Sequence, residues 1–182
     1  ILYFKQALKI DPTFEQSHWN LSLVLLMVGS YSKGWEEYEW RLKLKNFLLE
    51  KYFFNKKMWD GSSLNNKTII IYCEQGVGDN VQFARYISII SKLNVRIIVY
   101  CKKIMNFIFR KYPKINRVIN DVKKLPNFDY YIPIMSFPKV FKTTLKSIPQ
   151  EVRFIKPEKN NYYNWKKKLK KIKGLKVGLF WQ

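Results

Sequence analysis

Residues 68–86, TIIIYCEQGVGDNVQFARY, decide the fold. They open on a short β-branched apolar run at 69–73, which is typical of a strand buried on both faces. Gly76 and Gly78 follow, where the backbone can take a positive φ or approach a ligand closely. From Asp79 onward, apolar residues at helical spacing predict a helix. A strand, a glycine turn and a helix open a doubly wound α/β domain, in which ligands bind at the carboxyl ends of the strands.

Further strands are predicted after this unit, at residues 95–101, 117–119, 128–134 and 175–181. A helix is predicted over residues 102–111, and one or two helical turns over 136–142. An amphipathic basic helix is predicted over 160–171, with Tyr163 and Leu169 facing inward and the lysines facing solvent. The alternation of strands and helices predicts a parallel sheet with right-handed crossovers.

Composition limits the class of protein. The chain has 182 residues, 47% of them hydrophobic, which is enough for a core. No apolar run approaches the roughly 20 residues of a membrane helix. The two cysteines, Cys73 and Cys101, each end an apolar strand and have no CxxC partner, so we expect buried free thiols in a reducing compartment.

The formal net charge is +21. Lysines are dispersed along the chain together with Asn, Ile, Tyr and Phe, as an AT-biased coding sequence would produce. Because no aromatic-basic motif accompanies the charge, no specific nucleic-acid binding is predicted. The charge favours attraction to an anionic substrate or membrane surface. We expect a cytoplasmic protein, with peripheral contact to the inner membrane as an additional hypothesis.

Residues 1–50 are predicted to be helical and to contain a repeat. Pro12 stops one helix and closes one unit. In the next unit, Gly34 supplies the small residue at a helix crossing and Tyr38 follows one turn later. This spacing resembles a tetratricopeptide repeat, whose period is about 34 residues and which needs about three copies to bury a core, so more repeats are expected upstream.

The aromatic helix and the connector are predicted to join the two parts of the chain. Residues 34–41, GWEEYEWR, carry aromatic side chains on more than one face, so this helix is expected to dock the repeats onto the next domain. Residues 51–67 form a connector, in which Trp59 is expected to act as an anchor to that domain.

The glycine turn does not match the common nucleotide motifs. Gly76 and Gly78 lack the third glycine of a dinucleotide fingerprint, because position 81 is Val. No GK[ST] follows, so a phosphate-binding P-loop is also absent from the sequence. Neither an NAD site nor an ATP site is therefore predicted.

Asp79 has a structural and a catalytic interpretation. As an N-cap, its carboxylate would accept from first-turn amides, and Gln82 three residues later gives a capping-box spacing. As a catalytic group, a carboxylate at the carboxyl end of a strand can accept a proton from a substrate hydroxyl. The helix dipole lowers the basicity of such a carboxylate, so spacing alone favours capping.

Two strings carry a family resemblance, EQGVGD at 74–79 and QFARY at 82–86. Supporting strings occur in the right order, namely GWEEYEWR at 34–41, WDG at 59–61, KT at 67–68, TTL at 143–145, IP at 148–149 and VGLFW at 177–181. Together they resemble bacterial tetratricopeptide proteins that carry a glycosyltransferase family 9, heptosyltransferase-like, module. The resemblance spans nearly the whole chain.

The resemblance implies the GT-B architecture of two Rossmann-like domains, with an acceptor-side first domain, a donor-binding second domain and no metal. It divides the chain into tetratricopeptide helices, a connector, an acceptor-side domain and the first strand of the donor domain, at 1–50, 51–67, 68–173 and 174–182. Asp79 matches the family's proposed catalytic base. The residues implied to line the acceptor side are Glu74, Gln75, Gly76, Gly78, Gln82 and Arg85.

Two functions remain open at this point. The first is a transferase that moves a sugar from a nucleotide-sugar to a hydroxyl of an envelope glycan or protein, with the repeats recruiting a partner. Because the donor domain would follow its first strand, we expect a fragment that is inactive alone, with no cofactor and with the nucleotide-sugar bound by the missing domain. The alternative is a non-catalytic interaction scaffold with a degenerate α/β domain.

Overall fold

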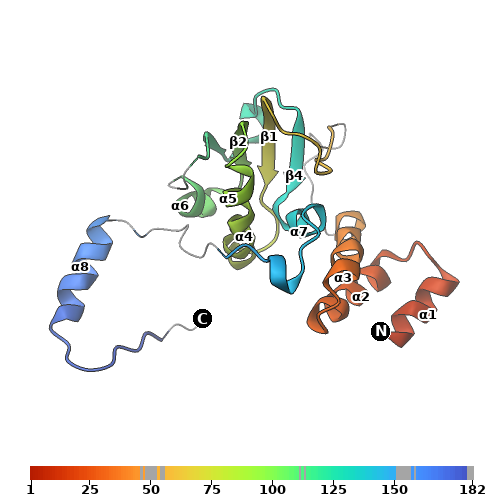
Figure 1. Ribbon diagram of the computed structural model, residues 1–182, viewed down its shortest axis with the longest axis horizontal. Helices are drawn as coiled ribbons and strands as arrows, with labels where there is room; N and C mark the ends of the chain where they lie inside the picture. Colours follow the sequence, from red (N-terminus) through yellow and green to blue (C-terminus); the bar gives the residue numbers. More distant parts are fainter. Residues whose placement is uncertain are drawn as a thin grey trace.

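The computed structural model describes residues 1–45, 47, 53, 56–110, 112, 114–150, 157 and 159–179. In this part of the chain a helical segment is followed by an α/β unit, and a C-terminal helix stands apart from both (Figure 1). The remainder of the predicted 1–50 segment and of the 51–67 connector lies outside the described residues. None of the described helices is long and apolar enough to cross a membrane.

The α/β unit is built on a four-stranded parallel sheet with the order β3-β2-β1-β4. Its strands are β1 Lys67–Tyr72, β2 Val95–Tyr100, β3 Arg117–Ile119 and β4 Tyr130–Pro133. In the pairing register, Ile70 of β1 lies between Ile98 of β2 and Tyr131 of β4. The predicted α/β class with a parallel sheet is confirmed, and the sheet is consistent with a Rossmann-like fold.

Short helices connect the strands. After β1 come α4 Val77–Phe83, η3 Ala84–Tyr86 and α5 Ile87–Ile90. After β2 come η4 Lys103–Met105 and α6 Asn106–Phe109, so the helix predicted over 102–111 is a 3₁₀ turn followed by one α-helical turn. The remaining short helices are η5 Val122–Lys124, η6 Ile134–Ser136, α7 Phe137–Val140 and η7 Leu145–Ser147.

The two faces of the sheet bury alternate residues of each strand, because successive strand side chains point to opposite faces. One face packs under the helices and includes Ile69, Ile71, Ile97, Val99 and Ile132. The other face packs around Phe53 and includes Ile70, Tyr72, Ile98, Ile119 and Tyr131. Cys73 and Cys101 are buried and free, as predicted.

The helical segment consists of α1 Leu2–Ile10, α2 Glu15–Met27, α3 Tyr31–Tyr38 and η1 Glu39–Lys43. Helices α2 and α3 form a hairpin whose turn contains Gly29, at a φ of +79°. At the crossing, a Cβ on Gly34 would lie 2.7 Å from Leu26 Cδ2. The prediction that Gly34 is the small residue at a helix crossing is therefore confirmed.

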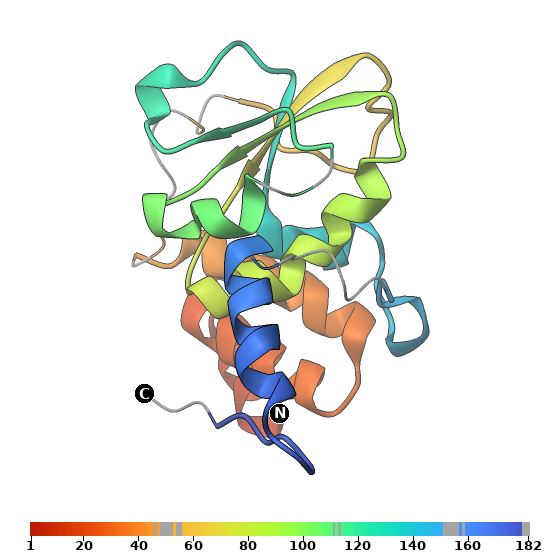
Figure 2. The same cartoon turned by 90° about the vertical axis from the view of Figure 1, so that its left-hand side faces the viewer.

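Aromatic contacts dock the helical segment onto the α/β unit, which lies above it in Figure 2. Trp35 meets Phe83 edge-on, with 6.1 Å between ring centroids. The Tyr38 hydroxyl lies 3.8 Å from Met135 Sδ. Trp59 is 4% exposed, and its backbone N–H donates to the Tyr131 carbonyl at 2.8 Å. The predicted docking role of the aromatic helix and the predicted anchor at Trp59 are both confirmed.

Two predictions at the C-terminal end are wrong. Helix α8, Lys159–Lys170, buries no residue, and Tyr163 is 63% exposed, so Tyr163 and Leu169 do not face a core. The run predicted to be a strand at 175–181 forms none in its described part, 175–179, and Leu175 is 91% exposed. A strand requires a paired neighbour for its backbone groups, and the described part of this run has none.

Candidate functional site

The loop between β1 and α4, together with the first turn of α4, contains most of the predicted site. Gln75, not a glycine, takes the left-handed conformation, with a φ of +56°. Gly76 has a φ of −81° and Gly78 lies in α4, so neither glycine takes the positive φ that was one of the two alternatives for them. Gly76 matters for a different reason, since a Cβ at this position would lie 3.0 Å from Asp79 Oδ2. Its missing side chain leaves room for the Asp79 carboxylate.

Asp79 occupies the third position of α4. Its Oδ2 accepts a hydrogen bond from the Gly76 N–H at 3.1 Å. The expectation that Asp79 is the N-cap, with Gln82 completing a capping box, is wrong, because the extended backbone of Gly76 starts the helix at Val77. Within the described residues, Asp79 Oδ1 accepts no hydrogen bond, and the residue is half-buried. One carboxylate oxygen is therefore held and the other is free to accept.

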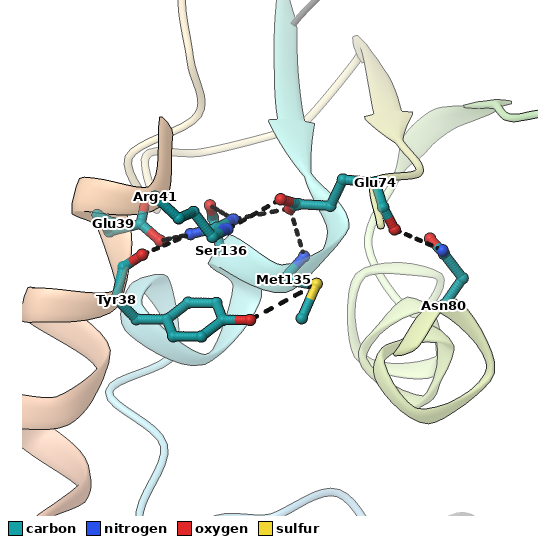
Figure 3. A network of polar contacts seen from close by, with 7 residues as sticks. All are labelled: Tyr38, Glu39, Arg41, Glu74, Asn80, Met135 and Ser136. Carbon is teal, nitrogen blue, oxygen red and sulfur yellow. Dashed lines mark hydrogen bonds and ion pairs between the residues drawn. The ribbon is translucent and has the colours of Figure 1, made fainter. Parts of the chain in front are cut away.

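Glu74 points into the protein, where Arg41 of η1 binds it (Figure 3). Arg41 Nε donates to Glu74 Oε2 at 2.8 Å, and Arg41 Nη2 donates to Glu74 Oε1 at 2.7 Å. Their side chains are 1% and 2% exposed. This paired, bidentate geometry is the strong form of an arginine–carboxylate contact. Glu74 thus faces the helical segment and is not open to an acceptor from solvent.

Further partners close this network. Arg41 Nη1 donates to Glu39 Oε1 at 2.7 Å and to the Tyr38 carbonyl at 3.2 Å. Arg41 Nη2 also donates to Ser136 Oγ at 2.8 Å, and the backbone N–H of Met135 donates to Glu74 Oε1 at 3.2 Å. The two buried charges are thus satisfied by each other and by groups from α3, η1 and η6.

Burial and the neighbouring carboxylates shift the pKa of Arg41 in opposite directions. Desolvation lowers the pKa of the guanidinium, but the Glu74 carboxylate outweighs it, so the pKa is raised above its usual range. Burial raises the pKa of Tyr38 to about 12, with Arg41 opposing this shift. Both groups therefore keep one protonation state throughout the physiological range.

The Arg41–Glu74 pair lies at the topological switch point of the sheet. Strands β2 and β3 lie on one side of β1, and β4 lies on the other. Glu74 follows β1 and Ser136 follows β4, and these strands are neighbours in the sheet. In open α/β sheets this crevice is the usual place for a ligand. Here the Arg41 side chain from the helical segment occupies it.

Asn80 of α4 holds the preceding loop through its side-chain amide. It is completely buried, and its Nδ2 donates to the carbonyls of Glu74 and Gly76, at 2.6 Å each. Among the described residues its Oδ1 has no hydrogen-bond partner. Asn80 holds the two carbonyls that flank Gln75, so it stabilises the left-handed turn.

A cavity of about 200 Å³ opens beside α4 and η3. Gln82 and Arg85 line it from the α/β unit, and Tyr31 and Trp35 line it from α3. Arg85 Nε donates to the Gln82 carbonyl at 2.9 Å. Of the residues expected on the acceptor side, Gln82 and Arg85 therefore share a cavity.

The other predicted residues take different places. Gln75 and Gly76 belong to the exposed loop, Gly78 is an exposed residue in the first turn of α4, and Glu74 lies inside the protein. Sequence reasoning missed Arg41 as part of the site. The available signal was its helical spacing from Gly34 and Tyr38, which places all three on one face.

Comparisons with known proteins give one distant relative. No family model matches the chain, and no solved structure matches it. The chain is 28% identical over 178 residues to Protein FlbA of Caulobacter vibrioides. The alignment covers 87% of this chain and 30% of FlbA, so this chain spans about a third of the length of that relative.

Proposed function

We propose that this chain is the acceptor-side half of a GT-B glycosyltransferase, preceded by tetratricopeptide helices, and that Asp79 is its general base. The observation that carries the proposal is the Asp79 carboxylate at the carboxyl edge of β1. One of its oxygens is held by Gly76 and the other is free. The EQGVGD and QFARY strings and the parallel sheet support the same assignment.

In the proposed reaction, this chain supplies the group that accepts the proton of the acceptor hydroxyl. An acceptor hydroxyl attacks the anomeric carbon of a nucleotide-sugar, the bond from that carbon to the nucleoside diphosphate breaks, and the diphosphate leaves with the electron pair. The hydroxyl proton passes to the Asp79 carboxylate. In this proposal the donor binds a second domain outside the described chain, and the reaction is that of a cytoplasmic enzyme acting on a glycan or protein acceptor.

Gln82 and Arg85 are proposed to bind the acceptor. They lie on α4 and η3, C-terminal to Asp79, and line the cavity with Tyr31 and Trp35. Amide and guanidinium groups donate hydrogen bonds to hydroxyls and anionic groups, and aromatic rings provide apolar walls. In this proposal Glu74 is a positioning residue, since it connects the loop to Arg41 and not to the acceptor.

The helical segment is proposed to recruit a protein partner. Helix α1 exposes Leu2 and Tyr3 at 64% and 81%, and Ile10 at 88%. These side chains give α1 an apolar surface that a protein partner would cover.

The test is an Asp79→Asn substitution in the complete protein, assayed for sugar transfer. Loss of the base should lower kcat by about 10²–10⁴-fold and leave the KM for the donor nearly unchanged. Asp121→Asn is the matched control, because Asp121 is also an aspartate that follows a strand and accepts a backbone N–H, from Lys123 at 3.0 Å. Unchanged turnover in Asp79→Asn would remove Asp79 from the mechanism.

One observation favours a second function, a non-catalytic interaction scaffold. The crevice between β1 and β4 is filled by Arg41, so the position at which such sheets commonly bind a ligand is taken by the protein itself. A scaffold would keep this closed core and use the helical segment alone. It predicts no donor binding and no effect of Asp79→Asn on partner binding.

A further inference from the structure

The C-terminal segment concentrates positive charge. Residues 159–179 contain no Asp or Glu and eight lysines, at positions 159, 166, 167, 168, 170, 171, 173 and 176. Helix α8 carries five of these, and the structure shows it apart from the sheet (Figure 1). The charge is therefore presented on a helix that stands apart from the sheet, and within residues 159–179 no carboxylate side chain balances it.

An apolar stripe runs along the same helix. Tyr162, Trp165 and Leu169 are spaced three and four residues apart, so they lie on one side of α8. They are 50%, 60% and 37% exposed. These three residues also line one groove, together with Lys166 and Lys170. The stripe is continuous, solvent-exposed and flanked by lysines.

We propose that α8 binds the surface of an anionic phospholipid bilayer, with the Tyr162–Trp165–Leu169 stripe turned toward the acyl chains. Helices that lie in the membrane interface combine Trp and Leu on one side with Lys on the other. Tyr and Trp prefer the headgroup level, and lysine stems extend from there to lipid phosphates. Each lysine near an anionic surface adds to the attraction, and residues 159–179 contain no acidic residue that would oppose it.

A bilayer fits the segment better than a nucleic acid does. A phosphate backbone would satisfy the lysines but would leave Leu169 and the neighbouring Ile172, at 51% exposure, in water. A bilayer satisfies the charge and covers the apolar side chains together. The proposal is independent of sugar transfer, because it uses no residue of the candidate site.

The experiment measures co-sedimentation of the full chain with vesicles of phosphatidylcholine alone or with one-third phosphatidylglycerol. We expect binding to the anionic vesicles only, weakening as salt rises. Trp165→Ala with Leu169→Ala should reduce the affinity at least about tenfold, since both apolar anchors are lost. The control is Ile104→Ala with Phe107→Ala, which removes apolar side chains 67% and 60% exposed elsewhere and should change nothing.

A charge pair completes the test. Lys166→Gln with Lys170→Gln should weaken binding by about tenfold or more. Lys102→Gln with Lys103→Gln removes the same charge from an exposed site outside α8 and should have little effect. Folding is checked by melting temperature, which should stay constant because α8 buries no residue.

Three outcomes would overturn the proposal. The first is no binding to anionic vesicles. The second is an equal loss for the two lysine pairs, which would mean that diffuse charge and not α8 holds the lipid. The third is tighter binding to single-stranded RNA than to vesicles, with Trp165→Ala and Leu169→Ala having no effect on either, which would assign the segment to nucleic acid.

Discussion

At the scale of single residues, the Arg41–Glu74 pair has the largest expected effect on stability. Both side chains are nearly inaccessible to solvent, and their hydrogen bonds join segments 33 residues apart. Removing water from two charges costs several kcal/mol, which only a well-paired geometry offsets. Loss of either partner leaves the other charge buried and unpaired.

We expect Arg41→Met to lower the free energy of unfolding by about 3–5 kcal/mol, because Glu74 would keep its charge in an apolar environment. Urea denaturation measures the change. Lys67→Met is the control, since it removes a cation from an exposed pair, with Asp129 at 3.0 Å, and should destabilise the protein far less than Arg41→Met. Equal effects of the two substitutions would show that the buried network does not hold the loop.

At the scale of elements, the α2–α3 crossing depends on Gly34. The space that a Cβ would need is taken by Leu26, whose backbone N lies 3.2 Å from the ideal Cβ position. Substitution to a β-branched residue therefore pushes the two helices apart.

Gly34→Val is expected to cost about 1–3 kcal/mol by overpacking the crossing. Lys33→Val on the exposed side of the same helix is the control, and it should cost only about 0.5 kcal/mol, from helix propensity. Thermal unfolding followed by circular dichroism compares the two. A Gly34→Val protein as stable as Lys33→Val would show that the helices do not meet at this residue.

Helix α8 is expected to be much less stable than the packed helices and strands. It has twelve residues and buries none of them, so it lacks the tertiary packing that stabilises most helices. In hydrogen exchange of the free chain, its amides should exchange far faster than those of β1 and β2. Protection of α8 equal to that of the strands would mean that α8 packs on the rest of the chain in solution.

The elements differ in how far the sequence predicted them. Strands β1 and β2 were predictable, because each is a local apolar run buried on both faces. The run at 175–181 has the same local pattern, but in its described part, 175–179, no neighbour pairs with it. Tyr163 and Leu169 of α8 were predicted to face inward, although periodicity cannot tell a core from a surface that another partner would cover.

The site was predicted less completely than the sheet, for a comparable reason. Asp79 follows β1 closely, so its place near the carboxyl end of the strand comes from local order, and Gln82 and Arg85 follow it along α4 and η3. The partner of Glu74 could not be found this way, because Arg41 reaches it from a separate helix 33 residues earlier. The start of α4 was placed two residues late, since Gly76 caps without a side chain.

At the scale of the whole molecule, the helical segment and the sheet form one packed body. Arg41 fills the crevice between β1 and β4, and Trp35 and Tyr38 cover the neighbouring α4 and η6. The candidate residues therefore lie outside that crevice, with Asp79 in the first turn of α4 and with Gln82 and Arg85 on the cavity beside α4 and η3. The proposed transferase would bind its acceptor at these residues, whereas a scaffold needs only the closed core.

Donor binding separates these two functions most directly. The measurement is the melting temperature of the complete protein with a panel of nucleotide-sugars, because a ligand that binds only the folded state stabilises it by RT ln(1 + [L]/Kd). The transferase account predicts that nucleotide-sugars of one nucleotide family raise the melting temperature, by an amount that grows with ligand concentration. A well-folded complete protein whose melting temperature responds to none of them would contradict it.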